Sequence, residues 1–166
     1  DVINNEHAGN MDNISYAFDD DTDTHIVTLN EVNITDGYVT PGRKAGIFAD
    51  NIGDVEIILS GNSSINIPSY EDPNPGADPP MINGVGIFVM NGNLTISGDG
   101  TLEIDVGDRA IILDAHGASE LLSLSFKGSV VVEANRAIFT EGEEGNQPYV
   151  YINDTANVTS DGIECG

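Results

Sequence analysis

The chain has 166 residues, of which 28 are acidic and five are basic, so its formal net charge at pH 7 is −23. Such a surface repels nucleic acids and anionic lipids, and we expect neither as a partner. No apolar run approaches the roughly 18–20 residues of a membrane-spanning helix, so we expect no membrane insertion. The sequence shows no signal peptide, which fits a mature secreted or cell-surface chain from which a leader has been removed.

Residues 1–24 are polar and do not share the pattern of the rest of the chain. We interpret them as an irregular N-terminal arm or cap. Asp19, Asp21 and Asp23 alternate in this segment and resemble the start of an EF-hand loop, which makes them candidate Ca²⁺ ligands. No glycine follows at the required position and no glutamate closes the loop, so solvated carboxylates are the alternative.

From residue 25 to residue 166 the chain repeats a short apolar strand at steps of about 25 residues, a period typical of solenoids. The copies are residues 45–50, 85–90, 109–114, 136–141 and 161–166, centred on Ile47, Ile87, Ile111, Ile138 and Ile163. The first step is longer because it contains a proline-rich segment, residues 69–83. We expect this segment to leave the repeat and to form no sheet.

Two further strands with alternating apolar residues lie inside each period, for example residues 55–59 and 64–67. We expect equivalent residues to stack about 4.8 Å apart in columns, one of which contains Ile65, Leu102, Val132 and Val158. The predicted fold is all-β, a right-handed parallel β-helix. It has three short strands per coil and about five coils over residues 25–166, in one domain.

Acidic residues recur at one corner of the predicted stack. Asp50, Asp114 and Glu141 end three of the repeated strands, and Met90 interrupts the series. Stacked carboxylates repel each other, and Ca²⁺ binds several converging oxygens, so these residues form a candidate Ca²⁺ site. Carboxylates in contact with solvent are the alternative.

A second series of side chains suggests carbohydrate binding. Phe48, Phe88 and Phe139 alternate with the inward-facing isoleucines, so we expect them to face outward as a ladder that stacks on sugar rings. The alternative is that the proline-rich segment or the N-terminal arm covers them. Arg109 and Arg136 occupy equivalent positions and could hold a carboxylated sugar, unless they simply pair with nearby acids.

We expect no catalytic residues. The three histidines lie in unrelated contexts, and no lysine stands beside an acidic cluster as a base would. Six Asn-X-Ser/Thr sequons exceed the number expected by chance and predict N-glycosylation, although asparagine at turns also generates such motifs. The sequons begin at Asn13, Asn33, Asn62, Asn93, Asn153 and Asn157.

Several of the repeated motifs also suggest a family. They are VTLN at 27–30, AGIFADN at 45–51, IILSG at 57–61, LTISGDGTLEI at 94–104 and SDGI at 160–163. Their rhythm, over roughly residues 25–166, resembles the right-handed parallel β-helix carbohydrate-binding-type domains of bacterial and archaeal adhesin-like surface proteins. The resemblance implies a fold shared with polysaccharide lyases and, in some relatives, Ca²⁺-dependent binding of acidic sugars without cleavage.

Two functions follow as expectations. The first is a non-catalytic, glycosylated extracellular surface protein, a structural solenoid that self-associates end to end into a filament or surface layer. We favour it because residues 161–166 open a coil with no polar cap behind them. The second is a Ca²⁺-dependent module that binds acidic polysaccharide, and a polysaccharide lyase is a third, less favoured reading.

Overall fold

The computed structural model describes residues 13–74, 76, 80–118, 120–143 and 147–165. These residues confirm an all-β protein, in which strands alternate with turns and no α-helix is present within the described ranges. No helix in this part of the chain has the length and apolar character needed to cross a membrane.

The strands form three sheets. In spatial order, sheet A contains β1 (Ile14–Asp19), β2 (Thr24–Asn30), β6 (Asp54–Ser60), β10 (Leu94–Gly98), β13 (Ser123–Phe126) and β16 (Tyr149–Ile152). Sheet B contains β17 (Asn157–Thr159), β14 (Val131–Ala134), β11 (Thr101–Val106), β7 (Asn62–Ile67) and β3 (Asn33–Ile34). Sheet C contains β18 (Ile163–Cys165), β15 (Ile138–Glu141), β12 (Arg109–Asp114), β9 (Met81–Met90), β5 (Arg43–Asp50) and β4 (Tyr38–Thr40), and β8 (Tyr70–Glu71) pairs with β9.

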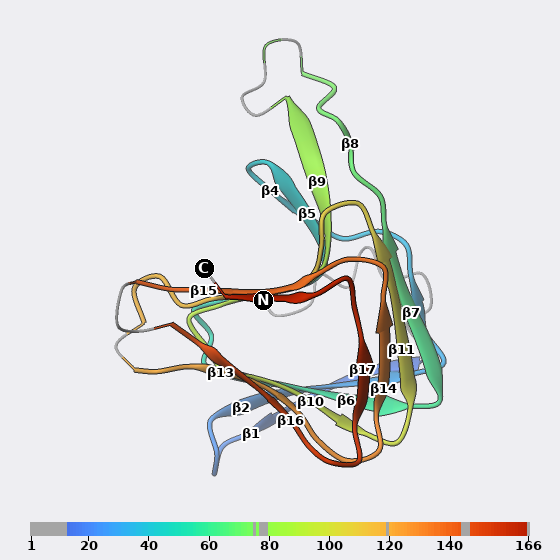
Figure 1. The fold of residues 1–166 in the computed structure, drawn as a ribbon, viewed down its shortest axis with the longest axis vertical. Coiled ribbons are helices and arrows are strands. Elements are labelled where there is room, and N and C mark those ends of the chain that lie inside the picture. Colours follow the sequence, from blue (N-terminus) through green and yellow to red (C-terminus); the bar gives the residue numbers. More distant parts are fainter. Residues whose placement is uncertain (1–12, 75, 77–79, 119, 144–146, 166) are drawn as a thin grey trace.

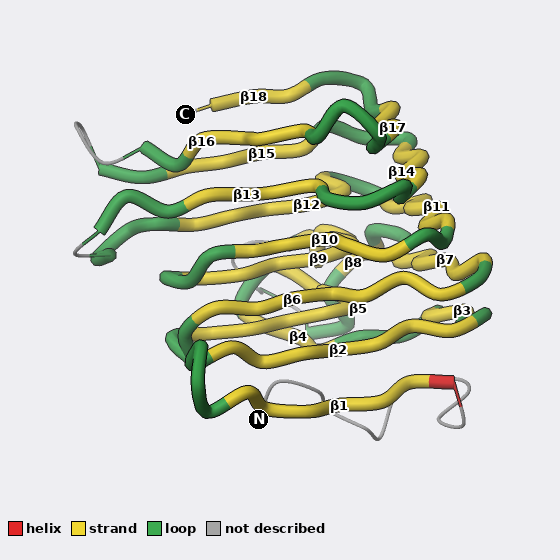
Figure 2. The backbone as a smooth tube through the Cα atoms, turned by 90° about the horizontal axis from the view of Figure 1, so that it is seen from below, coloured by secondary structure: helices red, strands yellow, loops and turns green. Residues whose placement is uncertain are grey.

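The three sheets lie around the larger of two apolar clusters, and Figure 1 shows how the sheets are arranged. In strands such as β6, alternation places one face inside, where Val55, Ile57 and Leu59 are buried and the residues between them are not. Phe126 is the largest fully buried side chain. Strands from distant parts of the sequence lie side by side in each sheet, so the chain stacks from β1 at one end to β18 at the other (Figure 2).

The predicted right-handed parallel β-helix is wrong. The structure contains three separate sheets of six, five and seven strands in place of a single solenoid of about five three-stranded coils. Sheets A and C are mixed, because β1 pairs antiparallel with β2, β4 with β5, and β8 with β9. These hairpin strands lie outside the repeated motifs, so a period measured on the repeats does not detect them.

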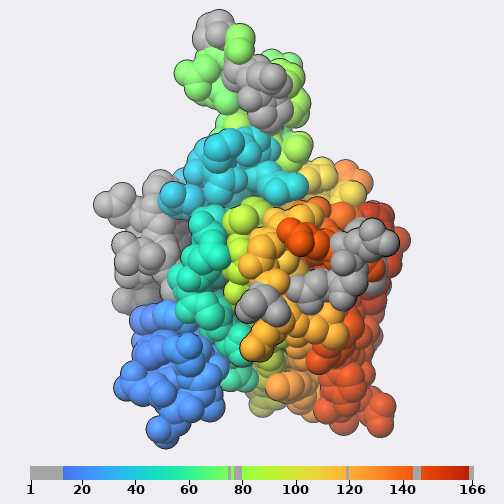
Figure 3. Space-filling view, turned by 90° about the vertical axis from the view of Figure 1, so that its left-hand side faces the viewer, coloured from blue at the N-terminus to red at the C-terminus, as the bar shows by residue number. Residues whose placement is uncertain are grey.

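Two segments predicted to be irregular contain strands. Within the predicted arm, Ile14–Asp19 forms β1, and residues 20–23 turn the chain back into β2. Within the predicted proline-rich excursion, Tyr70 pairs with Ile82 and Glu71 with Met81 at the base of a projection. This projection extends beyond the three sheets in Figures 1 and 3. Pro73 is two residues beyond the end of the short strand β8, so the backbone of β8 can pair before a proline occurs.

The register confirms one predicted column and corrects the other. Ile47, Ile87, Ile111, Ile138 and Ile163 are successive partners across sheet C. In sheet B, Ile65 pairs with Ile104, whereas Leu102 pairs with Ser63. Ser63 occupies a core position at 4% exposure, and its Oγ accepts a hydrogen bond of 3.2 Å from the backbone N–H of Val32. Because this core position holds a polar residue that is satisfied by a hydrogen bond, the apolar pattern placed Ile65 in the column of Leu102, where Ser63 belongs.

Candidate functional site

Four strands of sheet C end side by side at the corner where the sequence predicted a metal site. Across neighbouring strands, Asp50 pairs with Met90 and Met90 pairs with Asp114. Asp114 in turn pairs with Glu141. Asp114 and Glu141 are therefore direct neighbours on parallel strands. Asp50 lies beyond the intervening strand β9, so the structure brings together two of the three predicted ligands and separates the third.

His116, which sequence reasoning placed in no site, completes this corner. It lies just after β12, and its Nδ1 is 2.7 Å from Asp114 Oδ1. The same carboxylate oxygen accepts a 2.9 Å hydrogen bond from the His116 backbone N–H, which fixes the turn. One ligand atom each of Asp114, His116 and Glu141 lie within 4.8 Å of one another. The Asp-X-His spacing after a strand end was the sequence signal for this group.

The charges at the corner favour a positive partner. Asp114 is only 8% exposed, whereas the His116 ring is largely in solvent. The hydrogen bond that the protonated His116 ring donates to Asp114, followed by the charge of Asp114, raises the pKa of His116, and the more distant Glu141 and Glu143 act in the same direction. Two carboxylates and an imidazole are a donor set that binds divalent metal ions.

The second predicted Ca²⁺ site is a turn whose leading carboxylate already has partners. Asp19 Oδ1 accepts from the Asp21 N–H at 3.0 Å, and Oδ2 accepts from the Thr22 hydroxyl at 2.8 Å. The Thr22 hydroxyl and then the Asp21 N–H lower the pKa of Asp19, as expected for bonds to the charged form. Within the described ranges, Asp19, Asp21 and Asp23 form no convergent group of three ligands.

The predicted outward aromatic ladder is covered. Phe88 is 3% exposed and belongs to a small apolar cluster on the outer face of sheet C, with Phe48 and Phe139 half-buried against it. Tyr38 of the β4–β5 hairpin stacks on Phe48 at 5.0 Å, and Arg43 lies over the Phe88 ring. The expectation of a free sugar-stacking ladder is therefore wrong at Phe88, because aromatic burial stabilises this face.

The two predicted arginines differ in their surroundings. Arg109 lies over the Phe139 ring and forms ion pairs with Asp108 at 3.5 Å and with Glu164 at 3.3 Å. It thus connects β12 with the terminal strand β18. Arg136 is exposed just before β15. Arg109 has the charge-pairing role that was the alternative to sugar binding, and a role for Arg136 stays a prediction.

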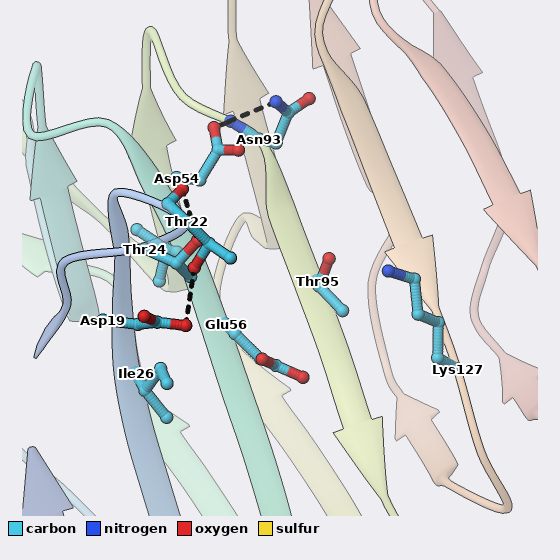
Figure 4. A pocket seen from close by; sticks show the side chains of 10 residues that line it. Asp19, Thr22, Thr24, Ile26, Asp54, Glu56, Asn93, Thr95 and Lys127 are labelled. Carbon is cyan, nitrogen blue, oxygen red and sulfur yellow. Dashed lines mark hydrogen bonds between the residues drawn. The ribbon is translucent and has the colours of Figure 1, made fainter. Parts of the chain in front are cut away.

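A polar groove of about 280 Å³ opens on the outer side of sheet A, next to the β1–β2 turn (Figure 4). Asp19, Asp54 and Glu56 line one side, and Lys127 lies on the far side beyond Thr95. Glu56 accepts a 2.6 Å hydrogen bond from Ser97. Sequence reasoning missed this groove because its residues come from strands far apart in the chain.

The sequons occupy different environments. Asn33, Asn62 and Asn157 are exposed, and Asn13, Asn93 and Asn153 are half-buried. Asn93 has a structural role, since its Nδ2 donates to Asp54 at 2.9 Å and its Oδ1 accepts from the Ser123 N–H at 2.8 Å. Its amide nitrogen is therefore engaged in the fold, while modification of the exposed asparagines stays a prediction.

The last layer of strands exposes side chains that face the core in the other layers. Ile111 and Ile138 are fully buried, yet Ile163 in the same column is 45% exposed. Ile152, the partner of buried Phe126, is 39% exposed. Tyr149 and Tyr151 on β16 are more than half exposed. The layer formed by β16, β17 and β18, which we name the open end, ends all three sheets in Figure 2.

No family model, curated protein or solved structure matches this chain. The resemblance to carbohydrate-binding-type domains of surface proteins therefore stays a prediction from the sequence motifs.

Proposed function

We propose that this protein is a non-catalytic structural protein of the cell surface or extracellular medium, which self-associates through its open end. The observation that carries the proposal is the exposure of core-facing Ile152 and Ile163, whose counterparts one layer inward are buried. Apolar area that faces solvent at a sheet edge is removed from water when a further layer of strands covers it.

The backbone of the open end offers the complementary contacts. β16, β17 and β18 are the last strands of sheets A, B and C, so each has one unpaired edge within the described structure. Edge strands with free N–H and C=O groups pair readily with strands of another chain. Lysine or proline residues, which commonly block such edges, are absent from these three strands.

The partner that fits the open end is a second copy of this chain, which binds through its own open end. A two-fold axis through the middle of β16 sets that strand antiparallel to its own copy and sets β17 against β18, each three residues long. Where the axis passes at Val150, Tyr149 of each copy lies opposite Tyr151 of the other and can form a cross-strand pair with it. Because an isologous contact closes on itself, it gives a dimer, and growth into a filament or layer requires a second surface.

Charge sets the conditions for association. The formal charge of −23 on each copy opposes a contact between two copies, and salt screens that repulsion. We therefore expect self-association to strengthen as the salt concentration rises, which suits a protein exposed to a saline exterior.

Binding of acidic polysaccharide has less support. The aromatic ladder that would stack on sugars is largely covered, and three of the charged residues that line the sheet A groove are acidic against one lysine. A uronate ligand would meet repulsion there.

Sedimentation velocity on the intact chain and on Ile163→Lys tests the proposal. We expect the unmodified chain to dimerise with increasing protein and NaCl concentration, and Ile163→Lys to remain a monomer. Ser60→Lys adds the same charge at an exposed position of the central strand β6 and should dimerise like the unmodified chain. A chain that stays monomeric throughout, or an Ile163→Lys variant that dimerises normally, would contradict the proposal.

A further inference from the structure

The corner formed by Asp114, His116 and Glu141 differs from an ordinary acidic surface in its donor atoms. It combines two carboxylates with an imidazole nitrogen, and one ligand atom from each lies within 4.8 Å of the others. The chain also holds the group in place: parallel pairing of β12 with β15 sets the two acids side by side, and the backbone bond from His116 to Asp114 directs the loop toward them.

We propose that Asp114, His116 and Glu141 bind a first-row divalent transition-metal ion, with Zn²⁺ as the principal candidate. Ca²⁺ and Mg²⁺ prefer sites made only of oxygen, whereas Zn²⁺ and its neighbours bind imidazole nitrogen together with carboxylate oxygen. The imidazole therefore moves the expected ion away from the Ca²⁺ predicted from sequence. This proposal uses none of the residues that carry self-association, so a negative result for metal binding leaves the self-association proposal unaffected, and the reverse also holds.

Metal binding replaces the contact between His116 Nδ1 and Asp114 Oδ1. The 2.7 Å separation of these atoms is a hydrogen bond, and both must turn slightly to face a common ion at bond lengths of about 2.0–2.2 Å. The ring of His116 is largely exposed and free to make this adjustment. Glu141 closes the third side, and solvent can supply the remaining ligands.

The nearby acids define the matched control. Asp50 ends the strand β5 as Asp114 ends β12, but it lies two strands away and contributes no ligand atom to the group. Asp50→Asn removes the same charge as Asp114→Asn without touching the site. His25 provides the histidine control, because its Nδ1 is 2.7 Å from the Tyr16 hydroxyl at the opposite end of the fold.

Calorimetric titration of the intact chain with ZnCl₂ and with CaCl₂ tests the proposal, and Co²⁺ absorption reports a nitrogen-containing ligand set. We expect one Zn²⁺ per chain, visible Co²⁺ bands that Zn²⁺ displaces, and much weaker Ca²⁺ binding. His116→Ala and Glu141→Gln should each weaken Zn²⁺ at least about tenfold. Asp50→Asn and His25→Ala should bind Zn²⁺ like the unmodified chain.

Three results would overturn the proposal. They are the absence of stoichiometric Zn²⁺ binding, an affinity unchanged by His116→Ala, and Ca²⁺ binding that equals Zn²⁺ binding. Far-ultraviolet circular dichroism of each variant establishes that it is folded, so that a lost affinity reports the ligand and not the scaffold.

Discussion

The two ends of the stack of strands differ in how far their core-facing side chains are buried. At the β1 end, Val27 on β2, Ile34 on β3 and Ile47 on β5 face the core and are buried, and β1 and β4 lie beyond β2 and β5. At the open end, Ile152 and Ile163 occupy the equivalent core-facing positions and stay substantially exposed. The same type of apolar residue is therefore covered at one end and uncovered at the other.

The difference lies in how the edge strands are arranged. Antiparallel β1 adds a strand beyond β2, antiparallel β4 folds back beside β5, and β3 is only two residues long. Folded-back and very short edge strands limit pairing with other chains. β16, β17 and β18 do not fold back, although β17 and β18 are only three residues long, and all three pair in parallel with the layer before them. Within the described residues, one end is thus bordered by folded-back strands, and the other leaves one edge of each sheet unpaired.

The largest expected effect is on the free energy of unfolding. It should differ between two residues of the same column, one inside the stack and one at the open end. Ile111→Ala creates a cavity at a fully buried position and should lower the free energy of unfolding by about 2–5 kcal/mol. Ile163→Ala, in the same column but 45% exposed, should lower it by less than about 1 kcal/mol in dilute, monomeric protein.

Urea unfolding of both variants measures this contrast. Equal losses for Ile111→Ala and Ile163→Ala would show that the last layer is as well covered as the interior, and the distinction between the two ends would then fail.

A smaller effect tests the turn that folds β1 back onto β2. Bonds from Thr22 and Asp21 lower the pKa of Asp19 below its ordinary value of 3.8. The ionised form stabilises the folded turn, so its contribution is present above pH 3.8 and is lost as the pH falls through the lower, folded-state value. Thr22→Val removes the leading bond and should return the pKa of Asp19 toward 3.8.

Carbon-detected NMR titration of the Asp19 carboxyl group follows this change, with Thr28→Val in the middle of β2 as the control. A pKa of Asp19 that is unaltered in Thr22→Val would show that the turn is not held by this hydrogen bond.

Much of the strand content was predictable from sequence, because alternation and a fixed period are local properties. The Ile47 to Ile163 column followed directly from the repeated motif and is confirmed by the pairing register. The arrangement of the sheets was not predictable in this way. β1, β4 and β8 pair with strands close to them in sequence, and their short segments carry no repeated motif.

The candidate site was predictable only in part, for a similar reason. Asp114 and Glu141 end repeated strands, so their proximity followed from the period. His116 lies in a loop after the strand, where the direction of the side chain depends on a backbone hydrogen bond to Asp114. The burial of Phe88 depends on what covers the outer face of sheet C, and strand alternation alone does not report that covering.

Amide hydrogen exchange of the unmodified chain at low and high protein concentration tests the role of the open end most directly. We predict that protection of β16, β17 and β18 rises with concentration, and rises further with NaCl, while protection of β1 and β2 stays constant. Protection that does not depend on concentration at the open end, or that increases only at the β1 end, would contradict this role.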